Sequence, residues 1–498
     1  MSNRTFRIYN TLSRKVDVVE PIEPEHLRFY ACGPTVYSYA HIGNFRSFLT
    51  ADLILRTAHA IGWRTTFVTN ITDVGHLTQD DVADAGGVDR MEKALESDEG
   101  RQFASIWDLA RYYTSVMLED WQSLNLREPN VRPRATEHVT QQIKAIEQLV
   151  AGGHAYETDK GVYFEVGTFP DYGKLSGNVM SDELREMVRD VVEDEGKRDP
   201  RDFALWKKDP SHLMLWYSPW GWGFPGWHIE CSAMSMQYLG EQFDMHTGGE
   251  DNKFPHHECE IAQAEAITRK EFVKYWVHTR FLQVEGEKMS KSLGNFLTVR
   301  DLLLPESEGG RGSNPLALRL ALISGQYRNP YNFTFDQLRA SAKHIQRFEE
   351  AAELVERASK QHEDGDDRIG SRLDLLYEKA LEAMLDDLNT PEAIAASIEG
   401  AKMIQGFGAN LNAASARAAH TWLNKINGLL GIVRHESDRP VQEEADDFAR
   451  VVDELIEQRA EARRSRDFAR ADAIRRRLDE MEIEVMDSAE GTKWRRKV

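Results

Sequence analysis

The chain has few cysteines and no long apolar run. Only Cys32, Cys231 and Cys259 occur among 498 residues. These are too few for a disulfide framework, and a cytosolic chain would keep them reduced. No run of about 18 or more apolar residues is present, and the opening MSNRTFRIYN lacks the apolar core of a signal peptide. We therefore expect a cytoplasmic protein with no membrane contact.

Positive charge is also scarce. The sequence has 62 Lys and Arg residues against 82 Asp and Glu residues, a formal net charge of −20. This balance argues against broad affinity for nucleic acid, because neutralising phosphates requires Lys and Arg. Residues 459–498 differ, with twelve basic and nine acidic residues. Charge alone favours a solvated helix there, and a local basic face remains the alternative.

Proline is absent between positions 34 and 129, and this region shows regular patterns. Residues 27–33 favour a short buried strand, and residues 45–61 carry apolar positions at helical spacing. Residues 63–72 are rich in Thr, Val and aromatics, as in a strand. A strand, a glycine turn, a helix and a second strand are typical of the start of a Rossmann-like α/β unit.

This α/β pattern stops and later resumes. The cluster EPNVRPRA (128–135) marks a boundary, and residues 243–249 and 255–267 predict a further strand and helix. Residues 131–225 are therefore expected to form an insertion that splits one nucleotide-binding domain. From about residue 335 the pattern is nearly all helical, and the polar stretch 434–444 precedes a small terminal unit.

Two short motifs indicate nucleotide chemistry when they are taken together. In HIGN (41–44), Gly43 permits close backbone approach, His41 can donate to phosphate oxygens, and a helix N-terminus attracts anions. In the loop EKMSKSLGN (287–295), the ammonium groups of Lys288 and Lys291 could close on a triphosphate. Either motif alone could be an ordinary surface loop.

Four separated residues could bind a metal. Cys32 ends the first predicted strand, and Cys231 comes directly after the aromatic stretch 216–230. His256 and Glu260 are four residues apart and share one helix face. Two thiolates, an imidazole and a carboxylate suit zinc. Each residue taken singly is better explained without a metal: Cys32 and Cys231 as small buried apolar groups, His256 as a residue at a helix N-terminus and Glu260 as a surface acid.

The sequence resembles the cysteinyl-tRNA synthetases, a family of class I aminoacyl-tRNA synthetases. HIGN and KMSKS resemble the two signatures of that class, and PGWHIECSAMS is peculiar to this family. The resemblance covers essentially the whole chain. Its motifs, in order, are CGPTVY (32–37), HIGN (41–44), NITD (70–73), RATEHV (134–139), DFALWK (202–207), PGWHIECSAMS (225–235), GGEDNKFPHHE (248–258), EIAQAEA (260–266), KMSKS (288–292), DDLNTP (386–391), RDFARADAIRRRL (466–478) and GTKWR (491–495).

The resemblance implies activation of L-cysteine with ATP and its transfer to tRNA(Cys). Zn²⁺, one per subunit, is expected to hold the substrate thiolate, and Mg²⁺ is expected with ATP. A monomer is expected. The implied zinc ligands are Cys32, Cys231, His256 and Glu260, and the implied cysteine pocket contains Thr72, Trp227 and His246. The implied ATP-binding residues are His41, Gly43, Asn44, Asp251, Lys288 and Lys291, of which His41, Asn44, Lys288 and Lys291 are also expected to be catalytic.

The expected fold is a Rossmann-like α/β catalytic domain split by an insertion, followed by an α-helical bundle and a small C-terminal tRNA-binding domain. The expected boundaries are 1–130 for the first catalytic half, 131–225 for the inserted connective domain, 226–275 for the second catalytic half, 276–334 for the KMSKS loop and stem-contact region, 335–433 for the anticodon-side bundle and 440–498 for the C-terminal anticodon-binding domain.

Several positions depart from the family pattern or fall outside the implied ligand set. Asn44 stands where His is frequent, and it can donate to phosphate but cannot be cationic. TDVGH (72–76) replaces a more acidic stretch. Cys259 stands where Asn is usual and is expected to be structural. His257 is expected to point away from the ligand face of its helix, so it is not counted among the zinc ligands.

Three other functions are compatible with parts of the sequence. A ligase that passes cysteine to a small amine would not need the basic C-terminal unit. A non-catalytic tRNA-binding or zinc-binding relative would not need His41, Lys288 and Lys291. A nucleotidyltransferase of the same superfamily would have no use for the four metal-ligating residues.

Overall fold

The computed structural model describes most of the chain. It covers residues 4–78, 87–177, 197–290, 293–360 and 367–433, together with two terminal strands and a few single positions between 455 and 478. The chain forms two compact units, Met1–Val433 and Arg434–Val498. No helix in the described parts is long and apolar enough to cross a membrane.

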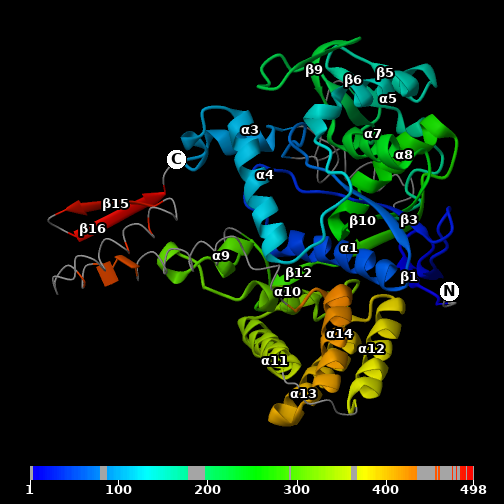
Figure 1. The fold of residues 1–498 in the computed structure, drawn as a ribbon. Helices are drawn as coiled ribbons and strands as arrows, with labels where there is room; N and C mark the ends of the chain where they lie inside the picture. The colour runs from blue at the N-terminus through cyan, green and yellow to red at the C-terminus, as the bar shows by residue number, and fades with distance from the viewer. Residues whose placement is uncertain are drawn as a thin grey trace. The chain divides into compact units, whose positions relative to one another are not determined.

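A four-stranded parallel sheet lies at the centre of the first unit (Figure 1). Its spatial order is β11-β10-β3-β4, and neighbouring strands pair in parallel throughout. Two of the intervening helices run between consecutive strands, as parallel pairing requires. The strands and these helices are β3 (His26–Ala31), α1 (Ile42–Ala60), β4 (Arg64–Thr69), β10 (Phe243–Gly249), α8 (His256–Thr268) and β11 (Val273–Thr279).

The strand order creates a switch point between β3 and β10. The chain leaves β3 toward β4 on one side of the sheet and leaves β10 toward β11 on the other. In open α/β sheets, ligands bind beyond the carboxyl ends of the strands at such a point. Ala31 lies opposite Thr247 in the register of β3 and β10, so the residues after these two positions face a natural binding crevice.

A separate antiparallel sheet comes from the chain between β4 and β10. Its order is β5-β6-β7-β9-β8, and the strands are β5 (Ala155–Glu157), β6 (Gly161–Phe164), β7 (Phe203–Lys207), β8 (Trp216–Ser218) and β9 (Gly221–Pro225). Only Gly226 separates β9 from α7 (Trp227–Leu239), which brings the chain back to the parallel sheet. All five strands fall within residues 131–225, the predicted insertion. The exact boundaries of that insertion remain a prediction.

The remaining elements before residue 335 flank the two sheets or connect them to the helical region. They are β1 (Arg7–Asn10), β2 (Lys15–Val18), α3 (Arg90–Glu96), α4 (Ile106–Ser123), α5 (Val139–Ala151), β12 (Leu282–Val284), β13 (Glu287–Lys288), α9 (Val299–Leu303), α10 (Pro315–Ile323) and β14 (Tyr331–Phe333).

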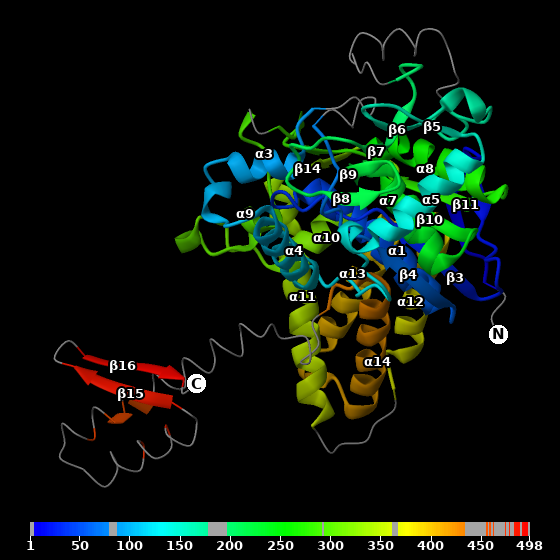
Figure 2. The same cartoon turned by 90° about the horizontal axis from the view of Figure 1, so that it is seen from above.

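Among the described residues between 335 and 433, the chain forms four long helices, which confirms the expected helical bundle (Figures 1 and 2). Thr334 caps the first of them, since its hydroxyl accepts from the N–H of Gln337 and the Gln337 side chain bonds back to the cap. Asn389 caps the third, and Pro391 occupies its first turn. The helices are α11 (Phe335–Ser359), α12 (Gly370–Leu385), α13 (Thr390–Phe407) and α14 (Ala413–Leu430).

The second unit contains an antiparallel hairpin that the sequence pattern did not reveal. β15 (Ile483–Ser488) pairs with β16 (Gly491–Arg496). The solvated helix that the charge pattern favours within residues 459–498 stays a prediction, because the arginines between positions 463 and 477 lie outside the described residues.

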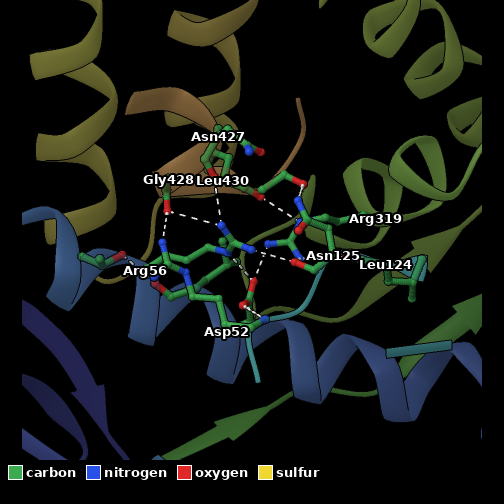
Figure 3. Close-up of polar contacts among 12 residues, drawn as sticks. Asp52, Arg56, Leu124, Asn125, Arg319, Asn427, Gly428 and Leu430 are labelled. Carbon is green, nitrogen blue, oxygen red and sulfur yellow. Dashed lines mark hydrogen bonds and ion pairs between the residues drawn. The ribbon is translucent and has the colours of Figure 1, made fainter. Parts of the chain in front are cut away.

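A buried ionic network joins α1 to the helical bundle (Figure 3). The carboxylate of Asp52, on α1, accepts from Nε of Arg56 at 2.7 Å, from the backbone N–H of Arg127 at 2.9 Å and from the guanidinium of Arg319 on α10. Asp52, Arg56 and Arg319 are all buried. Burial raises the pKa of Asp52, but the charges of Arg56 and Arg319 outweigh it and bring the pKa down to about 2.

Two arginines face one aspartate, and helix ends supply the missing negative charge. Nε of Arg319 donates to the carbonyl of Leu430 at 2.8 Å, and Nη1 donates to that of Leu124 at 2.9 Å. Nη1 of Arg56 donates to the carbonyl of Asn427 at 2.9 Å. These carbonyls lie at the C-terminal ends of α4 and α14, where unpaired oxygens carry partial negative charge. The network therefore fixes the ends of both helices against α1.

We expect Asp52→Asn to destabilise the first unit by about 3–5 kcal/mol, because two buried guanidinium groups lose their counter-ion. The matched control is Asp374→Asn, which removes an exposed partner of Lys425 and should change stability by less than about 1 kcal/mol. Chemical denaturation measures both.

The wild-type and Asp52→Asn proteins also give a pH test. The pKa of Asp52 falls from its usual 3.8 to about 2 on folding. The contribution of ionised Asp52 to the free energy of unfolding is therefore present above about pH 4 and is lost as the pH drops toward 2. The stability gap between wild type and Asp52→Asn should narrow over that range. A gap that stays constant would show that ionised Asp52 is not the source of the stabilisation.

Candidate active site

Four side chains that the sequence predicted as metal ligands lie together at the carboxyl edge of the parallel sheet. Their ligand atoms in Cys32, Cys231, His256 and Glu260 are all within 4.8 Å of one another. Nε2 of His256 is 3.1 Å from Oε1 of Glu260, and Sγ of Cys32 is 3.8 Å from the same oxygen. The described part of the chain thus brings separate sequence motifs to one point.

Three elements deliver these side chains. Cys32 comes directly after β3, and its N–H donates to the carbonyl of Thr247 in β10 at 3.1 Å. Cys231 lies on the first turns of α7, which begins immediately after β9 and Gly226. His256 and Glu260 are four residues apart at the start of α8 and therefore share a face. The four ligand atoms meet at the switch point of the sheet.

The geometry fits a zinc ion. Zinc binds N, O and S ligands at about 2.0–2.3 Å, which separates tetrahedral ligands by about 3.3–3.8 Å. Small side-chain adjustments would bring the four atoms to that spacing. Nδ1 of His256 lies 2.8 Å from Nδ1 of His228, so this partner orients the ring and leaves Nε2 facing the other ligands, as in many metal sites.

The pKa values show how these groups share protons. Burial raises the pKa of Cys32 well above its usual range. A hydrogen bond from Cys32 brings the pKa of Cys231 down to about 6. Burial raises the pKa of Glu260, but His246 and His256 outweigh it and bring the value to about 2. Burial lowers the pKa of His256, but its hydrogen bonds to Cys231 and Glu260 outweigh it and raise the value to about 10. A thiolate and a carboxylate are thus buried beside an imidazolium, whose proton a divalent cation would replace.

A second set of groups overlaps the first. Cys32, His246, His257 and Glu260 also have ligand atoms within 4.8 Å of one another. The expectation that His257 points away from the site is wrong, because its Nε2 lies 3.2 Å from Sγ of Cys32. Cys32 lies at the end of β3 and therefore reaches α8 from the side, where its sulfur contacts His257 as well as the ligand face of the helix. The prediction considered only which residues share a face of α8 and did not include the position of Cys32.

The number of thiols favours the first set, because it offers two soft ligands and the second set offers one. The histidine partners do not separate the sets, since His257 is held by His278 at 2.9 Å just as His256 is held by His228 at 2.8 Å. Nε2 of His246 lies 2.9 Å from Oε2 of Glu260. His246 is fully buried and stacks on Trp276 at 4.7 Å. It is therefore placed to orient Glu260 from behind.

The indole of Trp227 lies beside the candidate metal ligands. Its ring stacks on His76 with centroids 4.0 Å apart and an interplanar angle of 9°, and it lies 4.1 Å from the ring of His256. Nδ1 of His76 is 2.7 Å from Oγ1 of Thr35. No sequence motif singled out His76 as a site residue. Its segment, TDVGH (72–76), departs from the family pattern, and that departure was the one sequence feature that could have drawn attention to His76.

Thr72 begins that segment and is buried beside the same region. Its hydroxyl accepts from Nδ2 of Asn70 at 3.0 Å, and its carbonyl accepts from the N–H of Val36 at 3.1 Å. These bonds fix the chain after β4 against the chain after β3. Asp251 lies in the short turn Glu250–Lys253 after β10 and is exposed.

The N-terminus of α1 forms the other side of the crevice. His41 caps the helix: its Nδ1 accepts from the N–H of Asn44 at 3.1 Å, and Oδ1 of Asn44 accepts from the N–H of His41 at 3.1 Å. Burial lowers the pKa of His41 to about 4, so the ring is neutral at pH 7. Because Nδ1 accepts, Nε2 carries the proton and can donate to a phosphate. Asn44 keeps its amide N–H₂ group for the same purpose.

Gly43 brings the two signature motifs together. A Cβ at Gly43 would lie 2.9 Å from the His41 ring and 3.0 Å from the methyl group of Met289, in KMSKS. The N–H of Ile42 also donates to the carbonyl of Leu297 at 3.0 Å. Lys288 is exposed at the end of β13, and Lys291 lies outside the described residues.

Comparisons with known proteins agree with this arrangement. The model described as "tRNA synthetases class I (C) catalytic domain" matches residues 18–343. A DALR domain matches residues 380–434, and a cysteinyl-tRNA ligase anticodon binding domain matches residues 445–495. A cysteine–tRNA ligase of Salinibacter ruber is 58% identical over 514 residues, which cover 100% of this chain and 99% of that protein. This chain belongs to the cysteine–tRNA ligase family.

Other cysteine–tRNA ligases are similar over comparable lengths. Those of Chlorobaculum tepidum and Thermus thermophilus are 40% and 41% identical. The alignments cover 99% of both chains in the first case and 98% of both in the second. The family and enzyme class that the sequence motifs predicted are thereby confirmed.

Solved structures extend the likeness to the fold of another synthetase. Two structures of Mycobacterium tuberculosis methionyl-tRNA synthetase, both with methionyl-adenylate, superpose with TM-scores of 0.54 and 0.55 at 13% and 14% identity. Each covers 83% of this chain and 92% of the other. The cysteine–tRNA ligase chain therefore has a class I synthetase fold with helical C-terminal domains.

We expect the purified cysteine–tRNA ligase chain to contain about one zinc ion. Cys231→Ser should weaken zinc binding by about 100-fold or more, because it removes a thiolate from the first set. Cys259→Ser is the matched control, since Cys259 belongs to neither set. Elemental analysis and zinc release to a chromogenic chelator measure both. If Cys231→Ser retained zinc and His257→Asn lost it, the zinc ligands would instead be the second set.

Proposed function

We propose that this protein activates L-cysteine with ATP and transfers the cysteinyl group to the 3′ end of tRNA(Cys). The observation that carries the proposal is the convergence of two thiols, an imidazole and a carboxylate at the carboxyl edge of the parallel sheet, where the chain after β3 also carries the HIGN motif at the start of α1. The first group of side chains suits a thiol substrate and the second suits a phosphate substrate. A cysteine adenylation site needs both within one cavity.

The amino-acid side of the site would be built around Cys32, Cys231, His256 and Glu260. Zinc held there would supply a positive charge that favours the thiolate form of the substrate side chain over the thiol. Trp227, which stacks on His76 and contacts the tilted ring of His256, would offer the rest of its indole as an apolar wall for the short cysteine side chain. Its indole is held by aromatic contacts on two sides, so the wall is rigid.

The ATP side would act by positioning and by charge. The carboxylate of cysteine would attack the α-phosphate of Mg²⁺-bound ATP, forming cysteinyl-adenylate and releasing pyrophosphate. Nε2–H of His41, the amide of Asn44 and the N-terminus of α1 would donate to phosphate oxygens. Lys288 and Lys291 would neutralise the charge that develops in the transition state. Asp251 would contact ATP from the end of β10.

In the second step, a hydroxyl of the terminal adenosine of tRNA would attack the adenylate carbonyl, forming the ester and releasing AMP. Transfer to a small amine is the nearest alternative. The anticodon-binding match at residues 445–495 favours tRNA, because a small-amine ligase would not need that unit.

We expect cysteine alone among the twenty amino acids to support ATP–pyrophosphate exchange at a high rate. The kcat/KM for serine should be at least about 10⁴-fold lower, because a hydroxyl cannot replace the sulfur ligand for which the site is built. The Cys259→Ser variant should behave like wild type. Comparable exchange with serine and cysteine would contradict the thiol-selective site.

Truncation separates the tRNA and small-amine alternatives. A chain ending at Arg434 keeps the first compact unit, Met1–Val433, whole, so its cysteine-dependent pyrophosphate exchange should be close to that of the full chain. Its affinity for tRNA(Cys) should fall, and the salt dependence of binding should flatten as phosphate contacts are lost. Exchange kinetics and filter binding at several salt concentrations measure these effects. Equal charging of tRNA by both chains would show that the terminal unit makes no functional tRNA contact.

A further inference from the structure

Two aromatic side chains lie unusually exposed on the hairpin formed by β8 and β9. Tyr217 is 70% exposed and Trp222 is 60% exposed. The two residues are directly opposite each other in the ladder, and their ring centroids are 5.6 Å apart. Aromatic rings of this size are usually buried on a sheet, so an exposed pair indicates a surface that contacts another molecule.

The hairpin leads directly into the active site. β9 continues through Gly226 to Trp227, the first residue of α7. Trp227 is five positions beyond Trp222, so their Cα atoms are at most about 18 Å apart. A flexible strand that reaches the cysteine pocket could therefore also reach the aromatic pair, since a single nucleotide spans several ångströms.

A basic side chain shares the face of the pair. Lys207 lies opposite Phe224 in the antiparallel register of β7 and β9. Residues opposite each other share a face, and so do residues two apart along one strand. Trp222 and Phe224 are two apart, so Lys207 lies on the same face as Trp222 and Tyr217. β7 thus places a basic residue on the strand next to the one that carries Trp222, and basic groups combined with aromatic rings are typical of a surface for single-stranded nucleic acid.

We propose that Tyr217 and Trp222 form a stacking site for the unpaired nucleotides at the 3′ end of the tRNA, a proposal that rests on the proposed function. This strand has to reach the adenylate beside Trp227, and its bases have no pairing partners. The exposed rings offer open faces on which such bases stack. A protein partner would need a wider apolar surface than these two rings provide.

The test compares two RNAs on three proteins. The RNAs are a tRNA(Cys) transcript and the same transcript without its last four nucleotides. The proteins are wild type, the double variant Tyr217→Ala/Trp222→Ala, and the control Leu375→Ala, which removes an equally exposed apolar side chain from α12. Dissociation constants are measured at one salt concentration, and cysteine-dependent pyrophosphate exchange is measured without tRNA.

Shortening the RNA should weaken binding to wild type and to Leu375→Ala by about 5-fold to 100-fold, the range expected for one stacked base. The double variant should bind the full RNA about as weakly as wild type binds the short one, and shortening should cost it little more. Tyr217→Phe/Trp222→Phe should restore the wild-type difference, because it keeps two stacking rings.

The proposal is overturned if the double variant loses the same factor on shortening as wild type, because the pair then does not contact the 3′ end. It is also overturned if the double variant binds both RNAs equally well and as tightly as wild type binds the full transcript. Normal pyrophosphate exchange by the double variant separates these outcomes from failure of the proposed function, in which wild type itself would not support exchange with cysteine.

Discussion

The buried carboxylate of Asp52 holds the parallel-sheet region and the helical bundle of the first unit in register. It is the one anion between Arg56 and Arg319 in this network, and those guanidinium groups also bind carbonyls at the ends of α4 and α14. The same helix, α1, carries His41 at its N-terminus. The N-terminal end of α1, which carries the HIGN motif, therefore belongs to the same helix as the carboxylate that joins α1 to the bundle.

The candidate site has an analogous balance of charge with the opposite sign. Cys231 and Glu260 have low pKa values and the pKa of His256 is raised to about 10, so a thiolate, a carboxylate and an imidazolium lie together where water is excluded. His246 and His228 fix the orientation of Glu260 and His256 through hydrogen bonds. A divalent cation would take the place of the imidazolium proton and complete this arrangement.

Resemblance to the motifs of a known family was informative wherever the chemistry demands particular side chains. Cys32, Cys231, His256 and Glu260 are spread over more than 200 residues, yet the motifs that contain them indicated one metal site, and the fold brings them within 4.8 Å. Periodicity was informative for the helices after residue 335, because amphipathic faces repeat along the sequence. The same reasoning failed for His257, since the approach of Cys32 from a neighbouring strand is a tertiary property.

By itself the sequence determined the family, the class of reaction and the residue types available for it, because the motifs that resemble the family carry the side chains on which the chemistry depends. Only the tertiary structure decided which ring faces which. It stacked His76 on Trp227, turned Asn44 into part of a helix cap and left Tyr217 and Trp222 exposed on one hairpin. The physical reason is that stacking, burial and counter-ion balance are set by segments distant in the chain, and no local pattern records how those segments meet.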